Sequence, residues 1–189
     1  MPTDMFDARR KSLEEEFFNK QSATLTQKLK AVFEKKATRE SLKEAAGITD
    51  EAVLDALMAL NVTHQSMTAF GLFPLVEVAW ADGKLDDRER AALLTAARDK
   101  GIAPGTPAQQ VLDEWLRHPP GPDGRAAWYA YAAELGRKLT PAERHTVRDE
   151  LVRRGRAVAT ASGGLLGLGN RVSDKEEAVL AAIAAAFPD

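Results

Sequence analysis

The sequence predicts an all-α protein, a helical bundle of about eight or nine helices. Three observations predict this fold class. Val and Ile do not form the alternating runs that mark strands. Almost every segment between Gly or Pro positions carries the apolar spacing of a helix. The 189 residues suffice for one substantial hydrophobic core and are too few for two large ones.

The composition excludes several classes of function. There is no cysteine, so disulfides, thiolate catalysis and Cys-ligated metal centres are excluded. The formal net charge of −2 gives no general attraction to nucleic acid or to an anionic membrane. No apolar run reaches the about 20 residues of a membrane span, and the first residues carry no apolar signal core. We therefore expect a cytoplasmic protein without a nucleic-acid partner; peripheral contact with a membrane stays open.

The N-terminal region, residues 1–62, is predicted to be helical. Within it, residues 4–36 place apolar side chains at spacings of mostly four and seven, as in a long amphipathic helix. Such a helix would pack along a small domain or meet a partner helix, so it can support a homodimer or docking on a protein partner. Two short helices are expected next, one capped by Thr38 and ending near Gly47, the other capped by Thr49. The apolar stripe of the long helix comprises Phe6, Leu13, Phe17, Leu25, Leu29 and Val32.

The second predicted region spans residues 63–189. The segment 70–80 is apolar nearly all round, which is typical of a helix at the centre of a bundle. Asp86 and Glu89 then form the capping-box signature of a new helix that runs to about Lys100.

Proline and glycine delimit the later helices. Pro107 suits the first turn of one helix, which ends before the rigid linker 118–122. The next helix is expected over residues 125–136. Two further helix starts follow the capping-box pattern: Thr140 with Glu143, before a helix to about Ala161, and Ser173 with Glu176, before a last helix to Phe187.

Two further segments allow both a structural and a functional interpretation. The glycine-rich loop 163–169 lacks the Gly-Lys-[Ser/Thr] ending of a phosphate-binding loop, and it does not follow a strand. We interpret it as a flexible connector, with a contact to phosphate, a membrane or a partner as the alternative. The helix before it is rich in arginine, but Asp149 and Glu150 interrupt the run. We interpret this as a solvated face, with an acidic partner as the alternative.

Two stretches of the sequence, residues 83–93 and 170–180, align without gaps. Each reads as a tight turn, a basic residue, an apolar residue, a helix cap, Asp, a basic residue and Glu, followed by Ala and Leu. Each is therefore a helix start that follows a loop. The repeat predicts two related helix-loop-helix units that face each other about a pseudo-two-fold axis.

The stretch 79–89, AWADGKLDDRE, resembles the A-x-A-D-G-x-[IVL]-x-x-x-E signature of TerB-like, tellurite-resistance domains. The same signature appears in the N-terminal domain of a membrane-anchored DnaJ-like co-chaperone. The stretch 172–177 is similar to the start of the family's final helix, although Ser173 stands where the first repeat has Asp86. The resemblance covers about residues 63–187. It implies a stress-response module with an acidic, metal-binding face at this place.

Carboxylates gather at the two aligned helix starts. If these starts face each other, the side chains can converge, and oxygen ligands of this type suit Ca²⁺ or Mg²⁺. Most of these residues are equally explained as N-caps, capping-box partners or first-turn acids. Asp82 is the one that capping does not explain. The candidate metal ligands are Asp82, Asp86, Asp87, Glu89, Asp174 and Glu176.

Three functional hypotheses follow. The first is a non-enzymatic TerB-like module that binds a divalent cation or a cationic partner through its acidic surface. The second is a metal-free scaffold that dimerises or docks on a partner through residues 4–36. The third is an enzyme, a metal-dependent hydrolase, which needs His or carboxylate neighbours at an accessible metal. The first two are preferred because His64, His118 and His145 lie in different segments without metal-ligand spacing.

Overall fold

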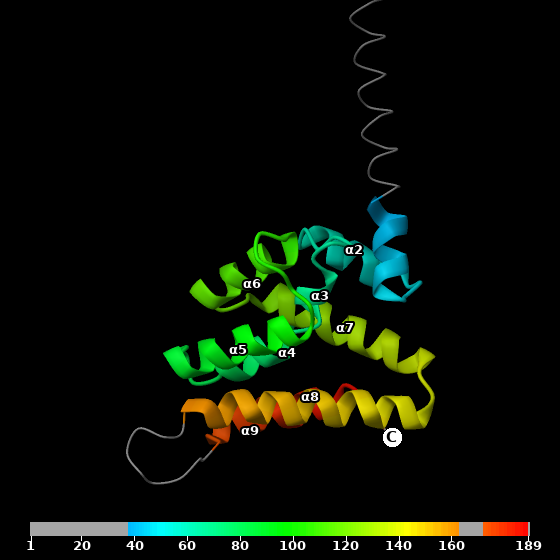
Figure 1. Ribbon diagram of the computed structural model, residues 1–189. Coiled ribbons are helices and arrows are strands. Elements are labelled where there is room, and N and C mark those ends of the chain that lie inside the picture. Colours follow the sequence, from blue (N-terminus) through cyan, green and yellow to red (C-terminus); the bar gives the residue numbers. More distant parts are fainter. Residues whose placement is uncertain (1–37, 163–171, 189) are drawn as a thin grey trace, which may run out of the picture. The chain divides into compact units, whose positions relative to one another are not determined.

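The computed structural model describes residues 38–162 and 172–188. Within these two ranges every regular element is a helix, which confirms the all-α prediction (Figure 1). By its internal contacts the chain divides into two units, Met1–Glu40 and Ser41–Asp189. The predicted long helix over residues 4–36 and the glycine-rich loop 163–169 lie outside the described residues.

The described helices follow one another with short connections. None of them combines the length and the apolar character that crossing a membrane requires. A helical segment over residues 38–46 comes first and ends at Gly47, whose φ of 66° is left-handed, as predicted. It is followed by α2 (Glu51–Ala59), α3 (Met67–Phe70), α4 (Phe73–Ala79), α5 (Asp87–Asp99), α6 (Pro107–Arg117), α7 (Pro122–Lys138), α8 (Pro141–Ser162) and α9 (Asp174–Ala185).

The predicted central helix over residues 70–80 is two helices in the structure. α3 ends at Phe70, and α4 starts after Leu72 with Pro74 in its first turn. Proline has no amide hydrogen to donate, so it is accommodated at a helix start, and the helix restarts here instead of continuing. The central position is confirmed, because all seven residues of α4 are buried.

Helix α4 lies between two clusters of buried side chains. On one side Phe73 and Val78 belong to a cluster with residues of α2, α7 and α9. On the other side Leu75 and Val76 pack with residues of α5 and α6. Trp115 of α6 packs against both clusters, and its ring centroid lies 5.4 Å from that of Phe73 in an edge-to-face arrangement. The two clusters therefore form one interior, with α4 at its centre.

Helix α8 packs against α4, α5 and α9 (Figure 1). Gly155 of α8 makes one close approach possible. A Cβ atom at this position would lie 2.7 Å from Cδ2 of Leu180 on α9 and 3.4 Å from Cγ2 of Val78 on α4. Both neighbours are fully buried. The absence of a side chain at Gly155 thus sets how closely α8 can lie to both helices.

Several predicted helix boundaries are wrong. The N-cap of α2 is Asp50, not Thr49, because Oδ1 of Asp50 accepts the amide of Val53 at 3.0 Å. An aspartate satisfies the free amides of a first turn as well as a threonine does, and the sequence offered both. The hydroxyl of Thr49 instead accepts Nζ of Lys138 at 3.3 Å.

The observed bounds of α7 and α9 also differ from the predicted ones. α7 begins at Pro122 rather than at 125, since proline fits the first helical position after a glycine N-cap. It also passes through Gly136 and ends at Lys138. Gly136 is not among the residues with positive φ, so it does not terminate the helix. α9 ends at Ala185, short of the predicted end.

Candidate acidic site

Helix α5 begins with a capping box formed by Asp86 and Glu89, as predicted. Oδ1 of Asp86 accepts the amides of Arg88 and Glu89, each at 2.8 Å. In return, Oε2 of Glu89 accepts the amide of Asp86 at 3.0 Å. The exchange satisfies amides that a helix start leaves without partners.

Asp82 also has a backbone partner, although capping did not predict one. Its Oδ1 accepts the amide of Lys84 at 2.9 Å, which makes a local turn of the kind that Asp favours. Gly83, between them, has a φ of 92°, so it adopts the left-handed conformation expected there. Asp82 therefore stabilises the loop from α4 to α5, and its side chain remains exposed.

Helix α9 begins with the same arrangement built from different residues. Oγ of Ser173 accepts the amide of Glu176 at 3.2 Å, and Oε2 of Glu176 accepts the amide of Ser173 at 2.6 Å. The predicted second capping box is thereby confirmed. Glu176 is 6% exposed and Glu89 is 5% exposed, so both capping glutamates are buried.

The two helix starts lie near each other. Burial is the largest cause that raises the pKa of Glu89 to about 7, and the hydrogen bond from the Asp86 amide opposes this shift. The negative charges of Asp86, Glu176 and Asp82 raise the pKa of Glu89 further. Glu176 lies at the start of α9 and Glu89 at the start of α5, so the charge at one helix start acts on the carboxyl at the other. Both helices pack on α8.

The remaining candidates, Asp87 and Asp174, are exposed in the first turns of α5 and α9. Among the described residues no backbone hydrogen bond holds their side chains, and the helix dipole favours negative charge at this position. We call the six residues at the two helix starts the acidic surface: Asp82, Asp86, Asp87, Glu89, Asp174 and Glu176.

A basic residue already contacts the edge of this surface. Nη2 of Arg156 on α8 lies 2.8 Å from Oε1 of Glu177 on α9, and both side chains are about half exposed. Glu177 directly follows Glu176 in the first turn of α9. This ion pair links α8 to α9 beside the start of α9.

Backbone amides take up part of the carboxylate oxygens at the two helix starts. Within the described ranges, no three or more His, Cys, Asp or Glu residues are arranged to hold a metal ion. Asp82, Asp86, Glu89 and Glu176 each commit one carboxylate oxygen to a backbone amide. A hard cation such as Ca²⁺ needs six to eight oxygen ligands, and these hydrogen bonds reduce the number on offer.

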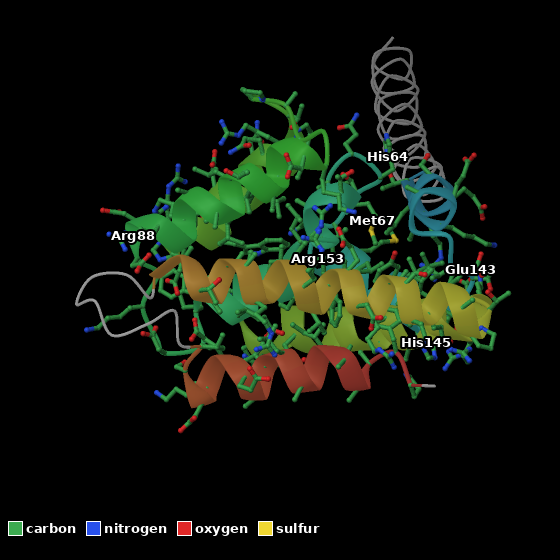
Figure 2. All side chains as sticks on the ribbon, turned by 60° about the horizontal axis from the view of Figure 1, so that its bottom comes forward. His64, Met67, Arg88, Glu143, His145 and Arg153 are labelled. Atoms are coloured by element: carbon green, nitrogen blue, oxygen red, sulfur yellow. The ribbon has the colours of Figure 1, made fainter. Side chains whose placement is uncertain are left out.

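The histidines lie on separate elements. His64 precedes α3, His118 follows α6, and His145 lies in the first turns of α8 (Figure 2). His118 is 4.0 Å from Oε1 of Glu114, one turn away on a well-exposed surface. The part of the chain that the structure describes therefore brings no two histidines together on one element.

Two arginines of α8 are paired with a carboxylate of the same helix. Arg153, labelled in Figure 2, donates to both carboxylate oxygens of Glu150, at 2.9 and 3.0 Å. Arg154 donates to Glu150 as well. Hydrogen bonds from Arg153 and then Arg154 lower the pKa of Glu150 to about 2. These pairs fit the solvated face that the sequence predicted.

One buried carboxylate was not among the predicted site residues. Glu77 of α4 is 3% exposed and pairs with Nε of Arg125 on α7. Its Oε2 is buried without a hydrogen-bond partner. Burial raises the pKa of Glu77, and the hydrogen bond and charge of Arg125 oppose this. A glutamate between Val76 and Val78 in an apolar helix is a signal that could have marked Glu77 as a buried carboxylate, although it does not identify Arg125 as its partner.

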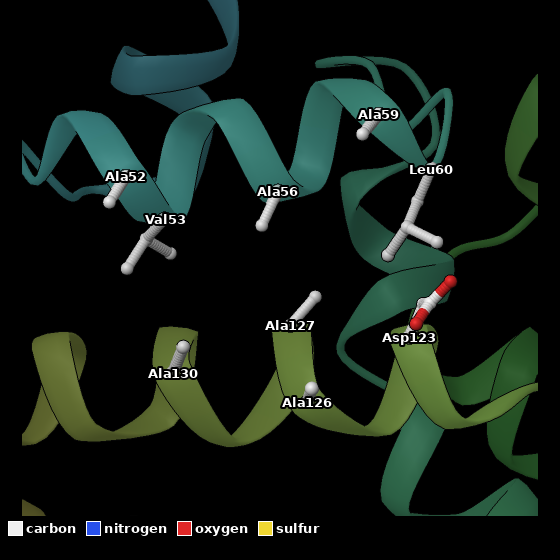
Figure 3. Close-up of a pocket in the computed structure, with 9 residues that line it drawn as sticks. All are labelled: Ala52, Val53, Ala56, Ala59, Leu60, Asp123, Ala126, Ala127 and Ala130. Carbon is white, nitrogen blue, oxygen red and sulfur yellow. The ribbon is translucent and has the colours of Figure 1, made fainter.

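An apolar groove of about 490 Å³ lies between α2 and α7 (Figure 3). Asp123, at the start of α7, is its single charged lining residue. The groove offers area for an apolar contact and no group for catalysis. Most of its wall consists of alanines: Ala52, Ala56 and Ala59 from α2, and Ala126, Ala127 and Ala130 from α7.

Comparisons with family models, with curated proteins and with solved structures found no match to this chain. The TerB-like class therefore stays a prediction that depends on residues 79–89 and 172–177.

Proposed function

We propose that this chain is a non-enzymatic binding module of the TerB-like, stress-response class. Its acidic surface binds a cationic segment, rich in lysine or arginine, of a protein partner. One observation carries the proposal: the starts of α5 and α9, far apart in the sequence, both present exposed carboxylates beside a buried capping glutamate, and like charges gathered in this way repel one another. A cationic group placed among them would relieve this mutual repulsion.

A cationic segment suits this surface better than a metal ion. An ammonium or guanidinium group needs only a few acceptors and takes them from exposed side chains such as Asp87 and Asp174. The capping hydrogen bonds can then stay intact. Binding of this kind weakens with salt, because exposed charges are screened over about 8 Å at physiological ionic strength. Ca²⁺ or Mg²⁺ binding is the competing outcome.

The test is a titration with a lysine-rich model peptide, followed by the amide resonances of α5 and α9. We expect saturable binding to the wild type that weakens as sodium chloride is raised. The double variant Asp87→Asn/Asp174→Asn removes two exposed charges and no capping hydrogen bond. Its affinity is expected to fall roughly 3- to 10-fold, the effect of losing two exposed ion pairs.

The matched control is Glu44→Gln/Asp99→Asn, which removes the same charge from exposed residues on helix 38–46 and at the end of α5. It should bind the peptide like the wild type. An equal loss in both double variants, or no binding to the wild type, would overturn the proposal. If Ca²⁺ or Mg²⁺ bound saturably and the peptide did not bind, the acidic surface would be a metal site instead.

The scaffold hypothesis concerns residues 4–36, outside the described residues, and stays a prediction. Its test is the molecular mass in solution with and without the first 36 residues. A dimer that becomes monomeric on truncation would support it.

A pH dependence of stability provides a separate prediction for Glu89→Gln. The pKa of Glu89 in the folded protein, about 7, lies above its ordinary value of 4.5. The folded state therefore holds a proton that the unfolded state has released, and stability falls as pH rises from about 4.5 through 7. Glutamine keeps an acceptor for the Asp86 amide and does not ionise. Between pH 5 and 8 the wild type should lose about 1–3 kcal/mol relative to the variant, measured by urea unfolding.

Glu176→Gln is the matched control for this measurement. It changes the corresponding residue of the other capping box and removes one negative charge that raises the pKa of Glu89. We expect the stability loss to remain but to occur at lower pH. If the wild type and Glu89→Gln lost stability in parallel, Glu89 would not be the titrating group.

A further inference from the structure

A second pocket, of about 440 Å³, lies where the end of α7, the start of α8 and the end of α9 meet. Arg137 and Arg144 are its polar residues. The rest of its lining is small or apolar: Ala133, Gly136, Ala185, Ala186 and Pro188. The acidic surface is built at the opposite end of α9, so this pocket is a separate feature.

Arg144 is held in place with part of its guanidinium unsatisfied. Its Nη1 donates to the carbonyl oxygens of Gly136 and Leu139, both at 3.2 Å, which caps the end of α7. Its Nε is buried and has no hydrogen-bond partner. An unsatisfied buried donor costs about 1–3 kcal/mol, and native structures rarely leave one without a reason.

The charge around the pocket is predominantly positive. Arg137 donates to Oε2 of Glu134, and Nζ of Lys138 lies 3.9 Å from Oε1 of the same carboxylate. One carboxylate thus serves two cations, and Arg144 adds a third without an acidic partner of its own among the described residues. The adjacent Glu143 is committed to Thr140, whose amide and hydroxyl both donate to it.

We propose that this pocket binds a small organic acid whose carboxylate is held by Arg144 and Arg137. A guanidinium carries five N–H donors, so Arg137 and Arg144 keep donors for a carboxylate beyond those given to Glu134 and to the carbonyls at the end of α7. The alanines and Pro188 leave room for a short hydrocarbon chain. The volume lies in the range of small-molecule pockets, about 300–1,000 Å³. The proposal does not depend on the acidic surface, so either can fail alone.

The test is a titration of the ¹⁵N-labelled protein with butyrate, followed at the Nε–H resonance of Arg144 and the amide of Gly136. We expect saturable shifts with a Kd of about 1 mM, which corresponds to a modest binding energy for so small a ligand. Butyramide, the same size without the charge, should not bind. Inorganic phosphate distinguishes a general oxyanion site from a site for a carboxylic acid. If phosphate bound as tightly as butyrate, the choice of a carboxylic acid would be contradicted.

Two variants test whether butyrate binds in this pocket, and neither disturbs the cap on α7. Arg137→Gln removes one exposed charge, and Ala185→Leu fills the pocket from an exposed position. Each should weaken butyrate binding at least fivefold. Arg153→Gln is the matched control, an equally exposed arginine further along α8, and should leave binding unchanged.

Three results would overturn the proposal. The first is the absence of saturable shifts in the wild type. The second is an equal loss of affinity in Arg137→Gln and Arg153→Gln. The third is binding of butyramide as tight as that of butyrate, because the negative charge would then not be recognised.

Discussion

Gly155→Leu is expected to destabilise the protein by about 2–4 kcal/mol, because it overfills a packed interface. The added Cβ alone would lie 2.7 Å from Cδ2 of Leu180 and 3.4 Å from Cγ2 of Val78. The rest of the leucine side chain would push α8 away from α9 and α4. Leu180 and Val78 are fully buried, so neither can yield without displacing other core residues. Urea unfolding at neutral pH measures the loss.

Gly136→Ala is the matched control for this prediction. Gly136 also lies inside a helix, but a Cβ there would meet Cδ1 of Phe187 at 3.7 Å and Cδ of Arg144 at 3.8 Å, which are ordinary contacts. Alanine should therefore stabilise α7 by about 0.5–1 kcal/mol, the usual gain over glycine in a helix.

A double variant tests the cause of the Gly155→Leu effect. Leu180→Ala alone should cost about 2–5 kcal/mol, because it leaves a cavity. When Leu180→Ala is combined with Gly155→Leu, the clash is removed. The double variant should therefore lose clearly less stability than the sum of the losses of the two single variants. Strict additivity, or a Gly155→Leu variant as stable as the wild type, would show that this contact does not limit the helix packing.

The sequence predicted the features whose causes are local. Asp86 with Glu89, Ser173 with Glu176 and Thr140 with Glu143 are each three residues apart, so their hydrogen bonds form wherever the helix starts. The left-handed Gly83 is local in the same way. Where two adjacent residues could both cap, as at Thr49 and Asp50, the pattern could not choose between them.

Features that depend on tertiary contacts were predicted less well. The aligned repeat indicated that the two acidic helix starts face each other, and in the structure both helices pack against α8. The pseudo-two-fold symmetry itself stays a prediction. The pairing of Glu77 with Arg125, 48 positions away, depends on how α4 meets α7. Neither residue carries a local signal for it.

Arg125→Met is expected to destabilise the protein by about 3 kcal/mol at pH 8, because it leaves Glu77 buried without a cation. Only one carboxylate oxygen of Glu77 is satisfied, and Arg125 satisfies it. Burial already raises the pKa of Glu77, and loss of Arg125 removes both causes that lower it. The pKa in the folded protein then rises further above its ordinary value, so stability should be lost as pH rises. At pH 5 the variant should lose markedly less.

The companion variants separate charge from packing. Glu77→Gln/Arg125→Met removes both charges and keeps the shape of the α4 side chain, so it should recover most of the stability and lose the extra pH dependence that Arg125→Met alone adds to that of Glu89 between pH 5 and 8. Arg153→Met breaks an exposed pair and should cost less than about 1 kcal/mol. If Arg125→Met were equally destabilised at pH 5 and pH 8, the loss would come from the packing of the arginine stem.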